Sequence, residues 1–249
     1  MSRGVFYDSP AMSQAAPATH HPPSSIWVVN FYRSAIGKKA VMAVTGLILF
    51  GWIFLHMVGN LKLYLGAAHL NEYAHWLRAI GSPAVPESGA LWIARLVLLV
   101  CVVLHIHAAY ALTMMNRAAR PVGYRARAYE KASYASRTMR WGGVIILLFV
   151  IYHLLHLTTG QAHPQFVEGD PYHNVVTGFR VWWVSAIYII ANLALGLHLY
   201  HGVWSMFSSL GVTHARFETF RRTFATVFAV LITAANISFP LAVLAGIVR

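Results

Sequence analysis

The chain has 249 residues, of which 58% are hydrophobic and only 10% are charged, and its formal net charge is +12 at pH 7. This composition excludes an ordinary soluble domain, in which about a quarter of the residues are charged. The cations lie mostly between long apolar runs, which is typical of a membrane protein and gives no reason to expect a nucleic-acid partner. The one cysteine, Cys101, excludes an intramolecular disulfide and an iron–sulfur cluster held by this chain alone.

The N-terminal part of the chain predicts a tail followed by a membrane domain. The first 26 residues are rich in Pro, Ser and Ala and contain no apolar core, so a disordered tail is expected and not a signal peptide. The membrane domain then covers residues 27–249. It opens with an amphipathic lead-in, Trp27 to Lys39, whose aromatic and basic side chains suit the headgroup region. A short amphipathic helix on the outer surface is expected between Leu65 and Gly81.

Five apolar runs are each long enough to cross a hydrocarbon core of about 30 Å, which takes about 20 helical residues. They predict transmembrane helices at about 41–63, 91–115, 141–159, 181–207 and 224–247. A polar loop is expected between the third and fourth spans, and Pro240 is expected to kink the fifth. The predicted fold class is therefore all-α, an integral membrane bundle of five transmembrane helices.

The distribution of Lys and Arg predicts the orientation of the bundle. With the N-terminus inside, 14 of the 19 basic residues fall on the inner side, and half of those 14 lie between the second and third spans, around the run Arg120 to Tyr129. Cytoplasmic loops carry an excess of Lys and Arg. We therefore expect a multi-pass protein of the cytoplasmic membrane with a cytoplasmic N-terminus.

Histidine recurs in four of the five spans, and none of the spans contains Asp or Glu. The histidines are His56, His105, His107, His153, His156, His198 and His201. Ionisable groups at membrane depth are costly and usually face the protein interior. Histidine without carboxylate on several helices points first to haem, whose iron takes two neutral imidazoles from facing helices. Zinc sites and proton relays would more often recruit carboxylate or cysteine, and a packing role remains the alternative.

Depth along the spans suggests how these histidines pair. At about 1.5 Å rise per residue, His107 and His198 each lie about 14–15 Å from the inner ends of their spans. By the same measure His56 and His153 lie about 18–22 Å from theirs. The sequence thus predicts an outer pair, His56 with His153, and an inner pair, His107 with His198. His105 and His107 point to roughly opposite helix faces, so only one of them can face a given haem.

Five motifs, in this order and spacing, resemble those of one membrane-protein family. They are FLHMVGN (Phe54–Asn60), LNEYAHWLRAIG (Leu70–Gly81), IHAAYAL (Ile106–Leu112), FVIYHLLHLTTG (Phe149–Gly160) and GLHLYHGVWSMFSSLGVT (Gly196–Thr213). From Phe31 onward the chain resembles the dihaem cytochrome b membrane-anchor subunit of succinate:quinone oxidoreductases and quinol:fumarate reductases, in the form with a single five-helix anchor.

The resemblance implies axial ligands at the positions that match the motifs. It assigns His56 and His153 to the distal haem iron and His107 and His198 to the proximal one, because IHAAYAL matches at His107. His156 and His201 then contact a haem edge, a propionate or a quinone, or simply pack.

The resemblance also implies a function and partners. The chain would be the membrane-anchor cytochrome b subunit of succinate dehydrogenase in a prokaryotic membrane, binding a flavoprotein subunit, an iron–sulfur subunit and lipid. It would carry electrons between the iron–sulfur subunit and a membrane quinone, expected to be menaquinone, through two haems b. It would do no chemistry on succinate itself, so any enzymatic role lies in its reaction with quinone.

The family places the quinone pocket on the outer side near the distal haem. Candidate residues there are Asn60, Glu72, His75 and His156, and a pocket near Arg33 and Ser34 on the inner side is the rival. Two other functions stay open from the sequence: a haem-free quinone-binding anchor, and the dihaem cytochrome of another quinone oxidoreductase, such as a hydrogenase or a formate dehydrogenase.

Overall fold

The computed structural model describes residues 26–119 and 132–249, with side chains from residue 139 onward in the second range. The expected tail, apart from Ile26, and the whole basic run from Arg120 to Tyr129 lie outside these ranges. The described residues form helices and connecting turns, with no β-strand among them. Five of the helices are long and apolar enough to cross a membrane, which confirms the predicted all-α bundle of five transmembrane helices.

The five long helices begin and end within a few residues of the predicted spans, except at the start of the third. They are α2 (Ala35–Asn60), α4 (Gly89–Ala118), α5 (Ala132–Leu157), α7 (Trp182–Ser209) and α8 (Glu218–Leu244). A 3₁₀ turn, η1 (Leu61–Leu65), extends α2, and a second, η2 (Ala215–Phe217), precedes α8. Pro240 lies inside α8, which continues past it to Leu244.

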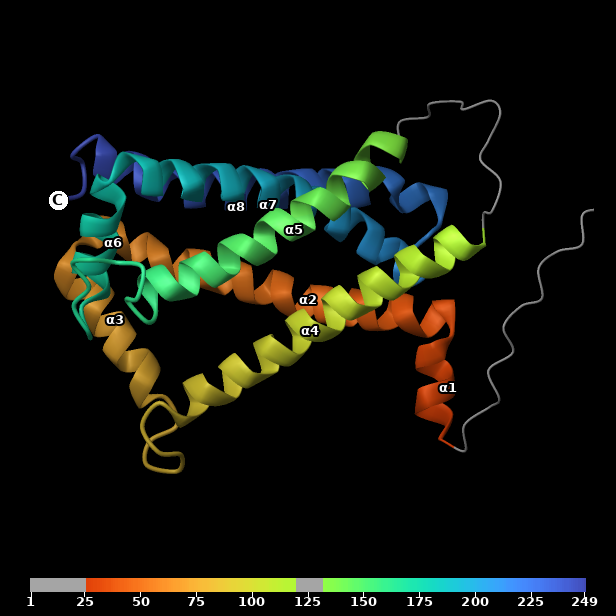
Figure 1. Ribbon diagram of the computed structural model, residues 1–249, viewed down its shortest axis with the longest axis horizontal. Helices are drawn as coiled ribbons and strands as arrows, with labels where there is room; N and C mark the ends of the chain where they lie inside the picture. Colours follow the sequence, from red (N-terminus) through yellow and green to blue (C-terminus); the bar gives the residue numbers. More distant parts are fainter. Residues whose placement is uncertain (1–25, 120–131) are drawn as a thin grey trace, which may run out of the picture.

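The short helices lie at the two ends of the bundle (Figure 1). Helix α1 (Trp27–Arg33) lies at one end, which we call the α1 end. Helices α3 (Ala67–Ala79) and α6 (Pro171–Arg180) lie at the other, which we call the α3/α6 end, together with the C-terminus. Helix α3 was expected as a surface helix, whereas α6 replaces part of the predicted polar loop. The reason is that Asp170 and Pro171 start a helix: Asp170 caps its first turn and proline is well suited to the first helical position.

Ser34 separates α1 from α2, so the predicted lead-in is not one continuous helix. Its hydroxyl accepts a hydrogen bond from the Gly37 amide at 2.9 Å and so caps the start of α2. The turn is tight, because a Cβ built on Gly37 would lie 1.9 Å from the carbonyl oxygen of Phe31. In Figure 1, α1 consequently runs roughly perpendicular to α2.

The long helices bury a modest core and leave much apolar surface outward. Helix α7 packs along α8, α2 packs against α4, and α5 packs against α7. The larger core cluster lies at the α3/α6 end and includes Phe179, Tyr188 and Phe239. A smaller one, formed by Met57, Leu199, Ala229 and Ile232, joins α2, α7 and α8. Many leucine, isoleucine and valine side chains of α4 and α5 are exposed, as expected of surfaces that face lipid tails.

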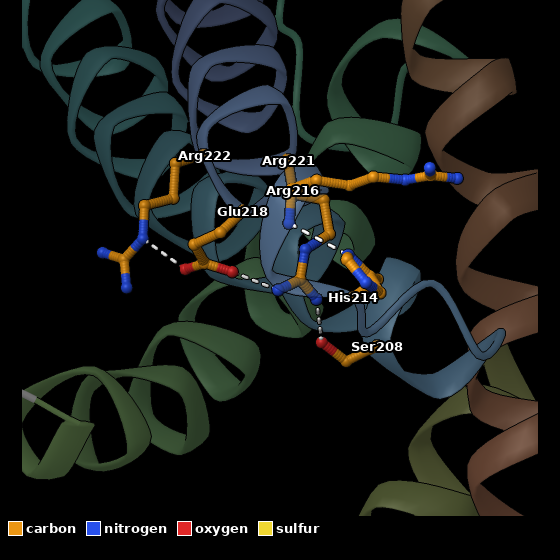
Figure 2. A network of polar contacts seen from close by, with 6 residues as sticks. All are labelled: Ser208, His214, Arg216, Glu218, Arg221 and Arg222. Carbon is orange, nitrogen blue, oxygen red and sulfur yellow. Dashed lines mark hydrogen bonds and ion pairs between the residues drawn. The ribbon is translucent and has the colours of Figure 1, made fainter.

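The connection from α7 to α8 is held by a cluster of charged side chains at the α1 end (Figure 2). Arg221 is buried and donates to the Ser208 hydroxyl at 2.7 Å and to the Glu218 carboxylate. Arg222 donates to the other carboxylate oxygen of Glu218, whereas Arg216 points away from the cluster. Glu218 thus neutralises two cations in the first turn of α8, where a carboxylate also interacts favourably with the helix dipole.

Candidate functional site: two pairs of facing histidines

His56 on α2 and His153 on α5 face each other in the half of the bundle nearer the α3/α6 end. Their ring centroids are 5.9 Å apart and their planes are inclined at 85°. A metal–imidazole bond is about 2 Å long, so two imidazoles that share one metal from opposite sides hold their centroids about 6 Å apart. The separation of His56 and His153 therefore fits two axial ligands of one metal ion.

A second pair lies deeper toward the α1 end, and its α4 member is His105. The ring centroids of His105 and His198 are 6.4 Å apart and inclined at 60°. His107 does not face His198: its Nδ1 lies 2.5 Å from the hydroxyl of Tyr32, and the two rings stack at 5.8 Å. We expected His107 to face His198, but in this structure His105 does. Residues two apart on a helix point about 200° apart, so His105 and His107 cannot both face His198.

Hydroxyl groups hold the ring nitrogens of several of these histidines. The Nδ1 atom of His153 lies 3.2 Å from the Tyr188 hydroxyl, and that of His105 lies 3.2 Å from the Thr45 hydroxyl. Metal-ligating histidines usually donate their second ring N–H to such a partner, which sets the tautomer that leaves Nε2 for the metal. His198 differs, because its Nδ1 is buried and makes no hydrogen bond within the described residues.

Space for a flat apolar group lies beside His198. A cavity of about 270 Å³ opens between α5 and α7, and its lining is apolar apart from the histidine: Met139, Trp141, Gly142, Ile145, Ala194, Leu197 and His198. Glycines border the rings of the pair, since a Cβ on Gly46 would lie 3.3 Å from His105 and one on Gly143 would lie 4.0 Å from His198. Small residues let a planar group approach a helix closely. The donor set and the ring separations fit two axial imidazoles on one haem iron.

His156 and His201 lie outside the two facing pairs. His156 is 2% exposed, stacks on Tyr152 and places its Nδ1 3.0 Å from the Tyr188 hydroxyl. His201 is half-buried, and its ring meets that of its neighbour Tyr200 edge-on. The structure therefore connects His156 to His153 through the hydroxyl of Tyr188.

A second cavity, of about 260 Å³, lies at the α3/α6 end and reaches His156, three residues after His153 on α5. Its lining is His156, Ala162, His163, Pro164, Gln165, Thr177, Gly178, Val181, Trp183 and Val184. Of the four candidate quinone residues, only His156 reaches it. Glu72 and His75 are exposed on α3, and Asn60 is half-buried at the end of α2. Ser34, named for the rival inner pocket, is engaged in the turn before α2.

Sequence reasoning did not single out Tyr188, Thr45, His163 or Gly178. Thr45 is a single polar residue in an apolar stretch of its span, and that isolation was the available signal, whereas Tyr188 lies near Ser185 and Asn192 and does not stand out. His163 and Gly178 come together only because α6 folds back on the end of α5. No periodicity in the sequence indicates this contact.

A comparison with known families agrees with the architecture. The family described as succinate dehydrogenase/fumarate reductase transmembrane subunit matches residues 113–237, half of the chain. The chain belongs to this family. Among curated proteins and among solved structures, none matches it.

The matched range of this transmembrane subunit runs from the last turns of α4 into α8. It contains His153, His198, Tyr188 and the cavity at the α3/α6 end, but not His56 or His105. The histidines that face His153 and His198, on α2 and α4, therefore lie outside the matched range. Membership makes the chain a multi-pass membrane subunit of the succinate dehydrogenase and fumarate reductase class.

Proposed function

We propose that this transmembrane subunit binds two haems b and carries electrons between an iron–sulfur partner subunit and a membrane quinone. The observation that carries the proposal is the presence of two facing histidine pairs, at 5.9 and 6.4 Å, at different depths of one bundle. A bound haem b would supply one-electron chemistry that the side chains of this chain lack.

The outer site takes His56 and His153, and the inner site takes His198 with one histidine of α4. For that α4 ligand the distance favours His105, whereas the resemblance of IHAAYAL favours His107. Gly46, which borders His105, lies ten residues before His56 on α2, which is about 15 Å along the helix axis. The two sites therefore follow one another along the membrane normal.

The α1 end faces the cytoplasm in this proposal. The described cations near that end include Arg33, Lys38, Lys39, Arg117, Arg140, Arg216, Arg221 and Arg222. The positive-inside rule favours this orientation. The iron–sulfur and flavoprotein partners would then dock at the α1 end, next to the inner histidine pair.

The quinone head would bind in the cavity at the α3/α6 end, beside the outer pair. A quinone carbonyl needs hydrogen-bond donors, and His156, Gln165 and Thr177 are polar residues of the wall. Val181, Trp183 and Val184 supply the apolar contact that a quinone ring requires. The quinone is expected to be menaquinone, and reduction at this end would take protons from the outer aqueous phase.

The test is the haem content of the purified complex, measured as a dithionite-reduced minus oxidised spectrum with quantification by pyridine haemochromogen. The wild type should hold two haems per chain, and His56→Ala or His153→Ala should each lose one. His69→Ala provides the matched control, because His69 is exposed on α3 and should keep both haems. A wild-type complex without haem would instead support the haem-free anchor.

A separate alternative is that this chain is the dihaem cytochrome of another quinone oxidoreductase, such as a hydrogenase or a formate dehydrogenase. Copurified partners distinguish them: hydrogenase or formate dehydrogenase subunits carry nickel or molybdenum, whereas the proposed partners carry flavin and iron–sulfur clusters. Metal and flavin analysis of the same preparation therefore completes the test.

A further inference from the structure

One hydroxyl lies between a proposed haem ligand and the proposed quinone pocket. Tyr188 on α7 places its hydroxyl oxygen 3.2 Å from Nδ1 of His153 and 3.0 Å from Nδ1 of His156, both on α5. Two histidine nitrogens therefore meet at an oxygen that carries a single proton.

The position of this hydroxyl is held by packing. Tyr188 is 5% exposed, and its ring meets those of Phe149 and Phe179 edge-on at 4.9 and 4.8 Å. Both contacts belong to the larger core cluster. A ring fixed on two sides cannot swing its hydroxyl away from the two histidines without opening that core.

The hydrogen-bond roles at the three groups determine one another. If Nε2 of His153 binds iron, its Nδ1 carries the proton and donates to the Tyr188 oxygen. The Tyr188 hydroxyl then donates its own proton to Nδ1 of His156. His156 must consequently carry its proton on Nε2, which makes that nitrogen a donor.

His156 is one of the residues that line the cavity at the α3/α6 end. Gly178, which also lines the cavity, packs against the edge of the His156 ring: a Cβ there would lie 2.9 Å from Nε2, so the approach of α6 to this nitrogen requires glycine. Within the described residues, Nε2 of His156 makes no hydrogen bond. The neighbouring His163 is already committed, because its Nε2 donates to the Asn174 carbonyl at 2.9 Å and its Nδ1 accepts from the Gln165 amide.

We propose that Tyr188 is a positioning residue that sets the tautomers of both histidines, so that His153 offers Nε2 to the outer haem iron and His156 presents Nε2–H to the quinone head. The inference rests on the proposed function, since it assumes haem at His153 and quinone in this cavity. Under this inference, the side chain of Tyr188 couples the ligand field of the outer haem iron to the hydrogen bond that His156 donates in the quinone pocket.

The experiment compares Tyr188→Phe with Tyr152→Phe in the purified complex. Tyr152 is a matched control, because its ring also stacks on His156 but its buried hydroxyl makes no hydrogen bond within the described residues. The readouts are haem content, the midpoint potentials of the two haems in an optical redox titration, and the KM for quinone.

Tyr188→Phe should keep both haems and raise one midpoint potential, because an imidazole without an acceptor at Nδ1 donates less electron density to ferric iron. The other potential should stay unchanged, and the KM for quinone should rise. Tyr152→Phe should leave all three readouts at wild-type values. Two haems with unchanged potentials in Tyr188→Phe would overturn the inference while leaving the proposed function standing. Absence of haem from the wild type would overturn both.

A second variant covers the case in which Tyr188→Phe does not assemble. His156→Phe keeps an aromatic ring in the stack with Tyr152 and leaves Tyr188 as the acceptor for His153. We expect both haem potentials to stay near the wild type and the KM for quinone to rise. An unchanged KM in this variant would contradict the assignment of His156 as the pocket donor.

Discussion

His105 and His198 face each other in the half of the bundle nearer the α1 end with ring centroids 6.4 Å apart, while His107, two residues along α4, is hydrogen-bonded to Tyr32. The two α4 histidines therefore serve different contacts. His105 joins α4 to α7, and His107 joins α4 to the surface helix α1.

The first prediction distinguishes the roles of His105 and His107 by the haem content of their alanine variants. His105→Ala should lose the inner haem, because it removes the imidazole opposite His198, whereas His107→Ala should keep two haems and loosen α1. Pyridine haemochromogen quantification on both purified variants is the measurement. The reverse result, with loss of haem only in His107→Ala, would mean that α4 is rotated in the assembled complex so that the residue of the IHAAYAL motif faces His198.

The second prediction concerns the attachment of α1. Lys38 is buried, and its Nζ donates to the carbonyl oxygens of Tyr32 at 3.0 Å and Arg33 at 2.8 Å. Lys38→Met leaves both carbonyls without this donor, which should cost about 1–3 kcal/mol locally. Hydrogen exchange of the α1 amides should become faster. Lys39→Met is the control, because Lys39 is exposed and its loss should leave the exchange unchanged. Equal exchange in the two variants would contradict the role of Lys38.

The third prediction tests the packing of α7 against α8. A Cβ on Gly196 would lie 2.2 Å from Oγ1 of Thr233, whereas one on Gly202 meets nothing within 4 Å. Gly196→Ala should therefore destabilise the bundle by about 1–3 kcal/mol. Gly202→Ala should be neutral or stabilising by up to about 1 kcal/mol, because alanine favours helix.

Thermal unfolding in detergent measures both glycine variants. Adding Thr233→Ala to Gly196→Ala should recover part of the lost stability, because it removes the clashing oxygen. If Gly196→Ala and Gly202→Ala unfold at the same temperature, the close contact between α7 and α8 is not formed.

The fourth prediction is a pH dependence at the start of α6. Asp170 accepts hydrogen bonds from the His173 amide and from the Asn71 side chain, each at 2.9 Å. The backbone hydrogen bond from His173 is the main reason that the pKa of Asp170 lies below its ordinary value, with a smaller contribution from Asn71. A lowered folded-state pKa stabilises the protein above the unfolded-state value of about 3.9. That stabilisation is lost as the pH falls through the lower folded-state pKa.

Asp170→Asn keeps a side-chain oxygen that can accept these hydrogen bonds, but it has no carboxyl group to titrate. Comparison with the wild type therefore isolates the stabilisation that comes from the ionised carboxylate. The wild type should be more stable than Asp170→Asn at pH 7, and the difference should shrink below about pH 4. Asp170→Ala removes the cap altogether and should cost about 1 kcal/mol at neutral pH. Unfolding measured from pH 7 to pH 3 checks both, and a difference that is constant with pH would contradict the lowered pKa of Asp170.

The length and spacing of the apolar runs were enough to predict five spans, because a lipid core requires each segment to satisfy its own backbone as a helix. Local signals were enough for α3, whose apolar residues repeat at helical spacing. The same reasoning missed α6, since Gly169, Asp170 and Pro171 were interpreted as loop residues when they also start a helix. It also missed the break at Ser34, which depends on the close approach of Gly37 to Phe31.

The sequence by itself determined the five long helices, the basic end of the bundle and the histidines at two depths, because each depends on the type and spacing of residues along the chain. It also pointed to His56 and His153, which the structure brings to 5.9 Å. Only the tertiary structure decided that His105 faces His198 and that Tyr188 joins His153 to His156. Those contacts depend on the rotation of each helix about its axis. Packing against neighbouring helices sets that rotation, and in an apolar span almost every face is hydrophobic enough to pack.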